Sequence, residues 1–178
     1  MDELDDRRLV LMARDGSADA SARLFERHWV DAWRTAYALT GRRELADDVA
    51  QDAFERVIRS LKTFDPTRPF APWLHRIVLN RARDVMRRER RQVLTAEVER
   101  PQSQNGAVGE EARALLAAIG SLPKDQREVL VLHRWAGHSL AEVAEIVGVP
   151  LGTVHSRLAR GTTELKRRLQ DDDARRPG

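Results

Sequence analysis

The chain has 178 residues, a formal net charge of +3 at pH 7 and no cysteine. This length allows one large or two small domains, and the missing cysteines exclude disulfides and thiolate zinc sites, which fits a reducing cytoplasm. No apolar run approaches the ~20 residues of a membrane-spanning helix and the acidic N-terminus is unlike a secretory signal, so we expect a cytoplasmic protein without direct membrane insertion.

The first half of the chain predicts helices near residues 7–14, 18–39, 43–62 and 71–90. Its two clear breaks are Thr40-Gly41 and the proline-containing stretch 65–69. No segment alternates with a period of two, so no strand is expected.

The helical periodicity fades after residue 91 and returns at residue 110. Glycine-containing breaks at 120–123, 137–138 and 148–152 separate the helices of the second half. We predict an all-α protein with two small helical domains joined by a flexible linker. The domains span 1–91 and 110–170, the linker spans 92–109, and a disordered tail spans 171–178.

One face of the helix expected at 43–62 is acidic, and the other is apolar. The polar face carries four side chains, Asp48, Gln51, Asp52 and Glu55. Paired carboxylates can serve general acid–base catalysis, but no histidine, nucleophile or metal-ligand pattern accompanies them. The face is therefore either solvated or a docking surface for a basic partner.

The helix expected at 71–90 is strongly basic, with seven arginines and two acids between residues 76 and 91. At helical spacing one side of it gathers an aromatic ring, an amide and three guanidinium groups, namely Trp73, Asn80, Arg76, Arg83 and Arg87. An aromatic ring can stack on an unpaired base, an amide can bond to its edge, and arginines can hold phosphates. With Phe64 and Phe70 in the preceding loop, the pattern favours nucleic-acid contact over a merely solvated stripe.

Residues 139–150 have the pattern of the first helix of a helix-turn-helix. Ser139 and Glu142 have the spacing of a capping box, and Gly148 can take the positive φ of a tight turn. A second helix should begin near Leu151, with Gly161 on its inward side.

The outward side of that second helix carries small, hydrogen-bonding and basic residues, as a DNA-recognition helix requires: Thr153, His155, Ser156 and Arg160. Arg157 falls nearer the inward side and suits a phosphate or structural contact. A helical hairpin with a solvated polar face is the alternative.

Several of these segments resemble a known family, the sigma-70 factors of bacterial RNA polymerase, and in particular their extracytoplasmic-function branch. Residues 46–54 resemble conserved region 2.2, and residues 70–84 resemble regions 2.3 and 2.4. Residues 122–129 together with 152–158 resemble region 4. The resemblance covers residues 9–169 and includes a linker where the family has one.

The resemblance implies a promoter-specific initiation factor whose sites lie on the faces described above. Asp48, Gln51, Asp52 and Glu55 would bind core RNA polymerase. Phe64, Phe70, Trp73, Arg76, Asn80, Arg83 and Arg87 would bind the −10 element, with the 64–70 loop as a pocket for a flipped base. Thr153, His155, Ser156, Arg157 and Arg160 would bind the −35 element. His155 and Ala159 depart from the residues many relatives carry, which affects the exact −35 sequence.

The implied partners are core RNA polymerase, promoter DNA and an anti-sigma factor, with no cofactor, metal or small-molecule substrate. A helix-turn-helix regulator of another type is the alternative, although it leaves the acidic and basic faces of the first half without a role. An enzyme is a third possibility that the five histidines do not favour. They show no ligand spacing, so each is more typical of a surface or packing position.

Overall fold

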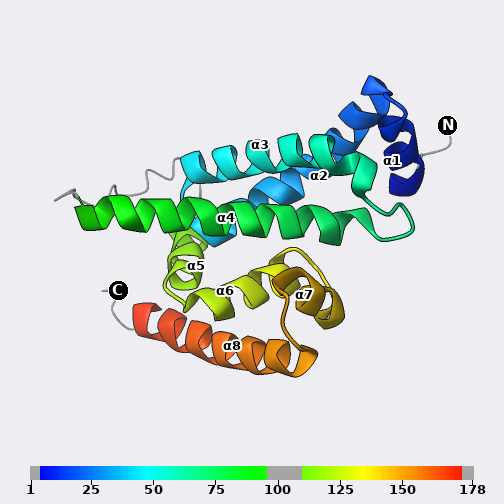
Figure 1. The fold of residues 1–178 in the computed structure, drawn as a ribbon. Coiled ribbons are helices and arrows are strands. Elements are labelled where there is room, and N and C mark those ends of the chain that lie inside the picture. Colours follow the sequence, from blue (N-terminus) through cyan, green and yellow to red (C-terminus); the bar gives the residue numbers. More distant parts are fainter. Residues whose placement is uncertain (1–4, 96–109, 174–178) are drawn as a thin grey trace.

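The computed structural model describes residues 5–95 and 110–173, and every regular element in these ranges is helical (Figure 1). The N-terminal domain contains α1 (Asp6–Arg14), α2 (Ala18–Thr40), α3 (Arg43–Ser60), the short 3-10 helix η1 (Leu61–Thr63) and α4 (Phe70–Thr95). The C-terminal domain contains α5 (Glu110–Gly120), α6 (Lys124–Leu130), the π-helical segment η2 (Val131–Trp135), α7 (Leu140–Val147) and α8 (Leu151–Asp173). The predicted all-α class is confirmed.

The helix ends lie where local capping chemistry places them. Ser17 caps α2 by accepting a hydrogen bond from the backbone N–H of Ala20, and Gly41 ends that helix with a φ of 70°. The predicted capping box of Ser139 and Glu142 is present at the start of α7, and Gly148 ends it with a φ of 75°. Glycine takes this left-handed conformation without the strain that a Cβ would cause.

Two predicted boundaries are wrong by a few residues. Helix α4 continues to Thr95, so residues 92–95 extend the helix instead of beginning the linker. Helix α8 continues to Asp173, so residues 171–173 are helical and not part of a disordered tail. An ion pair of 2.7 Å between Arg167 and Asp171 supports this last turn. The rest of the predicted linker and tail, 96–109 and 174–178, lies outside the described residues.

The core of the N-terminal domain lies between α2, α3 and α4, and α1 packs on α2. The apolar side chains predicted to face inward on α3 are all buried: Ala46, Val49, Ala50, Ala53, Phe54, Val57 and, in η1, Leu61. Leu74 and Val78 of α4 complete the core from the other side, fully buried. A Leu or Val buried in this way stabilises the fold by about 1.5–3 kcal/mol.

The C-terminal domain is built on a close crossing of α6 and α8. Gly161 lies at this crossing, and a Cβ at its position would come within 3.2 Å of the Gln126 Cβ. Val154 of α8 is fully buried beside α6 and α7. The turn between α7 and α8 therefore forms the predicted helix-turn-helix.

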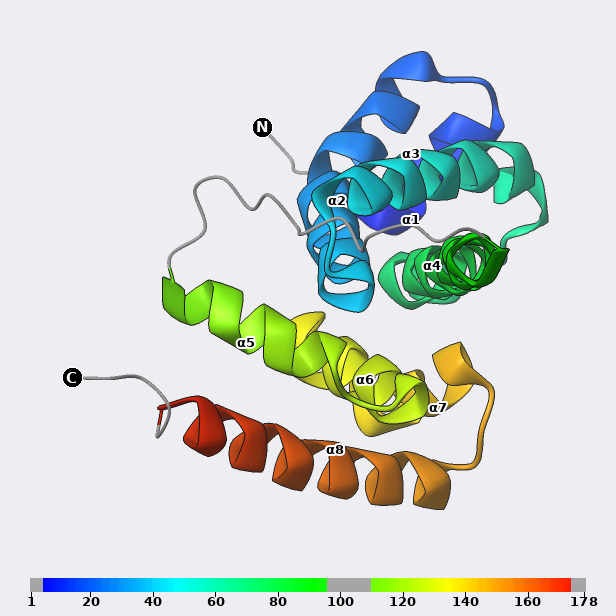
Figure 2. The same ribbon diagram turned by 90° about the vertical axis from the view of Figure 1, so that its left-hand side faces the viewer.

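The two domains contact each other. Helix α7 lies against α4, while α5 and η2 lie against α2. In Figures 1 and 2, α4 lies between α3 and the C-terminal domain, and α8 forms the side of the molecule away from it. Within the described ranges, no helix has the length and apolar character needed to cross a membrane.

Candidate nucleic-acid interface

Helix α4 presents the predicted row of aromatic, amide and basic side chains along one side. Arg76, Asn80 and Arg87 are exposed, and Trp73 and Arg83 are half-buried. Arg87 pairs with Asp84 one turn earlier, at 2.8 Å. These five side chains recur every three or four residues along α4, and we call them the α4 row.

The ring of Trp73 rests on two phenylalanine rings from the preceding loop. The centroid of Phe64 lies 4.4 Å from it and that of Phe70 5.7 Å. Phe64 and Phe70 are only 6% and 3% exposed, because they pack into the core beneath α4. Both rings are therefore largely covered and support the ring of Trp73, and their contact with a base stays a prediction.

A cavity of about 330 Å³ opens beside the 64–70 loop. Phe64, Trp73 and Arg76 line it from the N-terminal domain. Its other wall is α7, through Glu142, Glu145 and Ile146, and Glu145 also forms an ion pair with Arg68 of the loop. The C-terminal domain thus forms one wall of this cavity.

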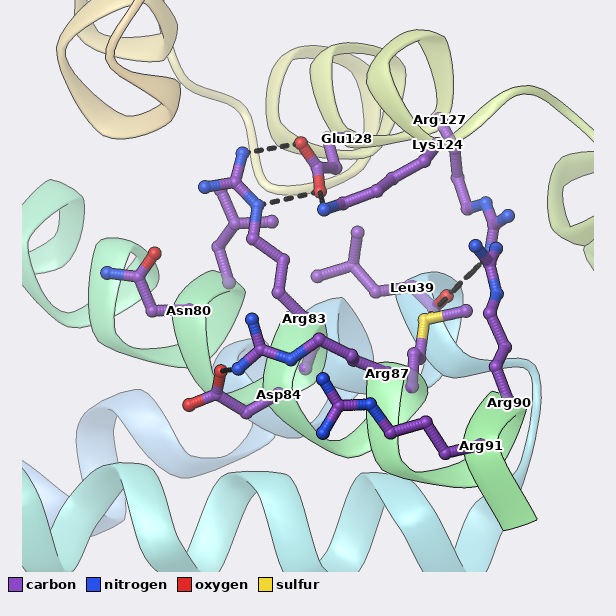
Figure 3. Close-up of a pocket in the computed structure, with 13 residues that line it drawn as sticks. Leu39, Asn80, Arg83, Asp84, Arg87, Arg90, Arg91, Lys124, Arg127 and Glu128 are labelled. Carbon is purple, nitrogen blue, oxygen red and sulfur yellow. Dashed lines mark hydrogen bonds and ion pairs between the residues drawn. The ribbon is translucent and has the colours of Figure 1, made fainter. Parts of the chain in front are cut away.

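A second, larger cavity of about 620 Å³ lies between α4 and α6 (Figure 3). Its lining is strongly basic, with six cationic side chains, Arg83, Arg87, Arg90, Arg91, Lys124 and Arg127, against the two carboxylates of Asp84 and Glu128. Glu128 is only 4% exposed, and its carboxylate accepts two hydrogen bonds from Arg83 at 2.8 and 2.6 Å. These bonds raise the pKa of Arg83. One member of the α4 row is therefore occupied by the C-terminal domain.

Arg127 of α6 is a contact residue that the sequence analysis did not single out. Its guanidinium is buried and donates to the backbone oxygen of Leu39, at 3.0 Å, and to that of Leu122, at 3.2 Å. Burial lowers the pKa of Arg127, and the nearby cation of Arg90 lowers it further. Both partners are backbone carbonyls, and Leu39 is 88 residues away in the chain, so no residue pattern in the sequence predicts this role.

Helix α8 displays the predicted −35 residues near its N-terminus. His155, Ser156 and Arg160 are exposed and Thr153 is half-buried. Arg157 instead turns inward and pairs with Asp125 of α6 at 3.2 Å, one of the two roles, phosphate or structural contact, that its position left open. The exposed side of α8 therefore keeps four of the five residues available.

The acidic face of α3 is also displayed as predicted. Asp48, Gln51 and Glu55 are exposed, whereas Asp52 is half-buried and pairs with Arg81 of α4. Glu55 also has a partner, Arg59 of its own helix at 3.0 Å, but it stays exposed, so the open part of this face centres on Asp48, Gln51 and Glu55. The described residues include no group of three or more His, Asp or Glu that could hold a metal ion.

Comparison with known proteins identifies relatives over both domains. The family model of Sigma-70 region 2 matches residues 24–92, and that of Sigma-70, region 4 matches residues 112–165. The chain is 30% identical to the ECF RNA polymerase sigma factor SigW of Bacillus subtilis, over 91% of this chain and 95% of SigW. It is 35% identical to SigE of Mycolicibacterium smegmatis over 80% of this chain, a match that spans 59% of the length of SigE.

A solved structure is similar over almost the whole chain. CnrH in complex with the cytosolic domain of CnrY superimposes with a TM-score of 0.76 and 32% identity, covering 94% of this chain and 98% of CnrH. The CnrH sequence, from Cupriavidus metallidurans, is an RNA polymerase sigma factor 33% identical to this chain.

Proposed function

The chain belongs to the sigma-70 family of RNA polymerase sigma factors, in its extracytoplasmic-function branch, and we propose that its two domains divide promoter recognition between them. It is a DNA-binding transcription-initiation factor that acts with core RNA polymerase, and not an enzyme. A helix-turn-helix regulator without a sigma role is not favoured, because a region 2 domain precedes the helix-turn-helix.

The α4 row binds the −10 element. The observation that carries this proposal is the combination of Trp73, Asn80 and three arginines on one face, beside a cavity of about 330 Å³. Trp73 stacks on an unpaired base and Asn80 bonds to a base edge, while Arg76, Arg83 and Arg87 hold the phosphates. Flipping a base costs a few kcal/mol, which the stack and edge contacts offset.

The exposed side of α8 binds the −35 element in the major groove. His155, Ser156 and Arg160 supply the base or phosphate contacts, and Thr153 lies at the helix start. The pairing of Arg157 with Asp125 assigns Arg157 to holding α8 on α6 instead of reading bases.

The acidic face of α3 binds core RNA polymerase. Asp48, Gln51 and Glu55 are the exposed side chains that a basic surface of the polymerase can contact. Asp52 contributes by holding Arg81 and thereby fixing α3 on α4. We place the protein in the cytoplasm, where the polymerase and the DNA are.

We also propose control by a protein inhibitor, an anti-sigma factor. The support is CnrH, which was solved in complex with the cytosolic domain of CnrY and resembles this chain throughout its length. A pull-down from native cells under several stresses tests it, and a recovered protein must also block transcription in vitro to qualify.

In vitro transcription tests the main proposal. Core RNA polymerase is mixed with fragmented genomic DNA of the source organism, with and without this chain. New transcripts with defined start sites, sharing upstream −10 and −35 sequences, are expected only when the chain is present. A chain that fails to associate with core polymerase at all would overturn the proposal.

A further inference from the structure

Two histidines from different domains meet at the interface. His75 lies on α4 and His138 lies in the loop between η2 and α7, 63 residues further along the chain. The Nε2 of His138 is 2.7 Å from the Nδ1 of His75, and the two residues are 5% and 3% exposed. Because both ring nitrogens of an imidazolium carry protons, this hydrogen bond requires one of the facing nitrogens to be unprotonated.

Helices of both domains surround the histidine pair, His75 and His138. From α2, the Thr35 hydroxyl lies 3.3 Å from the His75 Nε2, and the backbone of Asp31 and the ring of His28 are also close enough to act on His75. From η2, the His133 Nδ1 lies 2.8 Å from the backbone oxygen of His138.

On α7, the only charged group acting on the pair is the Glu142 carboxylate, which favours a proton on His138. Burial of His138 has the larger effect, so the pKa of His138 is lowered despite the Glu142 carboxylate. Burial and then the neighbouring His138 lower the pKa of His75 to about 4. The pair is therefore neutral at pH 7 while it is buried.

The sign of the pH effect follows from where the rings are buried. Separation of the domains takes His138 away from His75 and uncovers the side of His75 that His138 contacts, so the pKa of His75 rises toward 6.5. Protons then bind the open arrangement more tightly than the closed one. The contribution of the pair to closure is fully present above pH 6.5 and is lost as the pH falls toward 4.

The closed arrangement engages part of the α4 row with carboxylates of the C-terminal domain, while Arg76, Asn80 and Arg87 stay exposed. Glu128 occupies Arg83, while Glu142 and Glu145 wall the cavity beside Trp73. Glu128 thereby occupies a guanidinium that the proposed function assigns to a DNA phosphate. A chain closed in this way cannot engage a −10 element with its full row.

We propose that the domain interface is an autoinhibitory closure, and that protonation of His75 and His138 opens it. The statement that opening uncovers a promoter-binding surface rests on the function proposed above. The pH-dependent opening does not rest on it, because it is a property of the isolated chain.

The test is energy transfer between two dyes on the full chain. The protein has no cysteine, so Glu44→Cys on α3 and Lys166→Cys on α8, both exposed positions, give one label in each domain. Transfer is expected to fall between pH 7.5 and pH 5.5. Release of His75 alone raises the opening equilibrium constant by up to about tenfold over this range, the limit reached if its pKa rises fully to 6.5. Unchanged transfer over this range, with unchanged helicity by circular dichroism, would overturn the proposal.

Three variants separate the histidine pair from other titrating groups. Replacing both rings (His75→Gln with His138→Gln) should abolish most of the response, and His138→Gln alone should reduce it if the double variant does not fold. His155→Gln, at an exposed position of α8, should keep the full response. If energy transfer in His138→Gln falls with pH as much as in the unaltered chain, other groups cause the pH dependence and the proposal is wrong. Neither an unchanged energy transfer nor an unchanged His138→Gln response would alter the outcome of the transcription assay, so failure of this proposal is distinguishable from failure of the proposed function.

Discussion

Arg83 of α4 donates two hydrogen bonds to the carboxylate of Glu128 on α6, one from Nε at 2.8 Å and one from Nη2 at 2.6 Å. This bidentate geometry is among the stronger pairings that proteins use, and here it joins two domains. Since Arg83 also belongs to the α4 row, the same guanidinium cannot hold a DNA phosphate while Glu128 holds it.

Glu128→Gln should therefore loosen the interface. Loss of the charge weakens the bonds to Arg83 by about 1–2 kcal/mol, which favours the open arrangement about five- to thirtyfold. The two-dye chain should show lower transfer at pH 7.5, and affinity for a single-stranded −10 oligonucleotide should rise. Glu164→Gln is the matched control, because Glu164 pairs only with Arg167 and Arg168 of its own helix among the contacts described. Equal transfer in the two variants would argue against a closing role for Glu128.

Asn80→Ala should slow promoter opening more than it weakens the binding of core polymerase. Loss of one base-edge hydrogen bond costs about 1 kcal/mol, or about fivefold in the opening rate. Gln51→Ala on α3 is the matched control. It should lower the affinity for core polymerase with little effect on the rate of promoter opening. The two quantities are measured by permanganate footprinting and by titration with labelled core enzyme. If Asn80→Ala lowered core affinity as much as opening, Asn80 would be a structural residue.

Arg160→Ala should weaken −35 binding by about 1–3 kcal/mol, as expected for an arginine that contacts a base or phosphate. The measurement is the affinity of the polymerase complex for a duplex −35 element. Arg167→Ala removes the same charge further along α8, where the side chain pairs with Glu164 and Asp171, and should have a smaller effect. Equal losses would indicate a general effect of charge.

Gly161→Val should destabilise the C-terminal domain by about 1–3 kcal/mol. The added Cβ would lie 3.2 Å from the Gln126 Cβ, and the two methyl groups would force α6 and α8 apart. Gly152→Ala, on the same helix with open space around it, should be neutral or stabilising by up to about 1 kcal/mol. Urea unfolding curves of the two variants should move in opposite directions or differ clearly in midpoint.

The capping box should lose its contribution only in strong acid. Hydrogen bonds from Ser139 lower the pKa of Glu142 below its usual 4.5, so this stabilisation is present above pH 4.5 and is lost as the pH falls through the lowered value. Ser139→Ala should cost about 1 kcal/mol. The stability difference between the two chains should stay constant from pH 8 to 5 and shrink below 4.5. A difference already shrinking near pH 6 would contradict this assignment.

Local features of the sequence were sufficient to predict most of the helical architecture. Caps, positive-φ glycines and apolar periodicity act within a few residues, so Ser139, Gly148 and the inward face of α3 were all predicted correctly. The family resemblance then assigned a function to each domain. The matches to the family models of region 2 and region 4 support this assignment.

The contacts between domains could not be predicted in the same way. Glu128 is 45 residues from Arg83, and His138 was assigned to a surface or packing position with no reason to meet His75. Such pairs depend on how two folded domains fit together. The burial of Phe64 was not predicted for a related reason: its loop has no periodicity to reveal that the ring packs against the core.

The pairing of Arg83 with Glu128 has a consequence for gene dosage. Both residues belong to one polypeptide, so each chain carries its own competitor at a local concentration on the order of millimolar, as for other short tethers. Dilution, overproduction or depletion of the protein leaves that concentration unchanged. A separate inhibitor can be titrated away by making more of its target, whereas restraint exerted within a single chain holds for every copy that the cell synthesises.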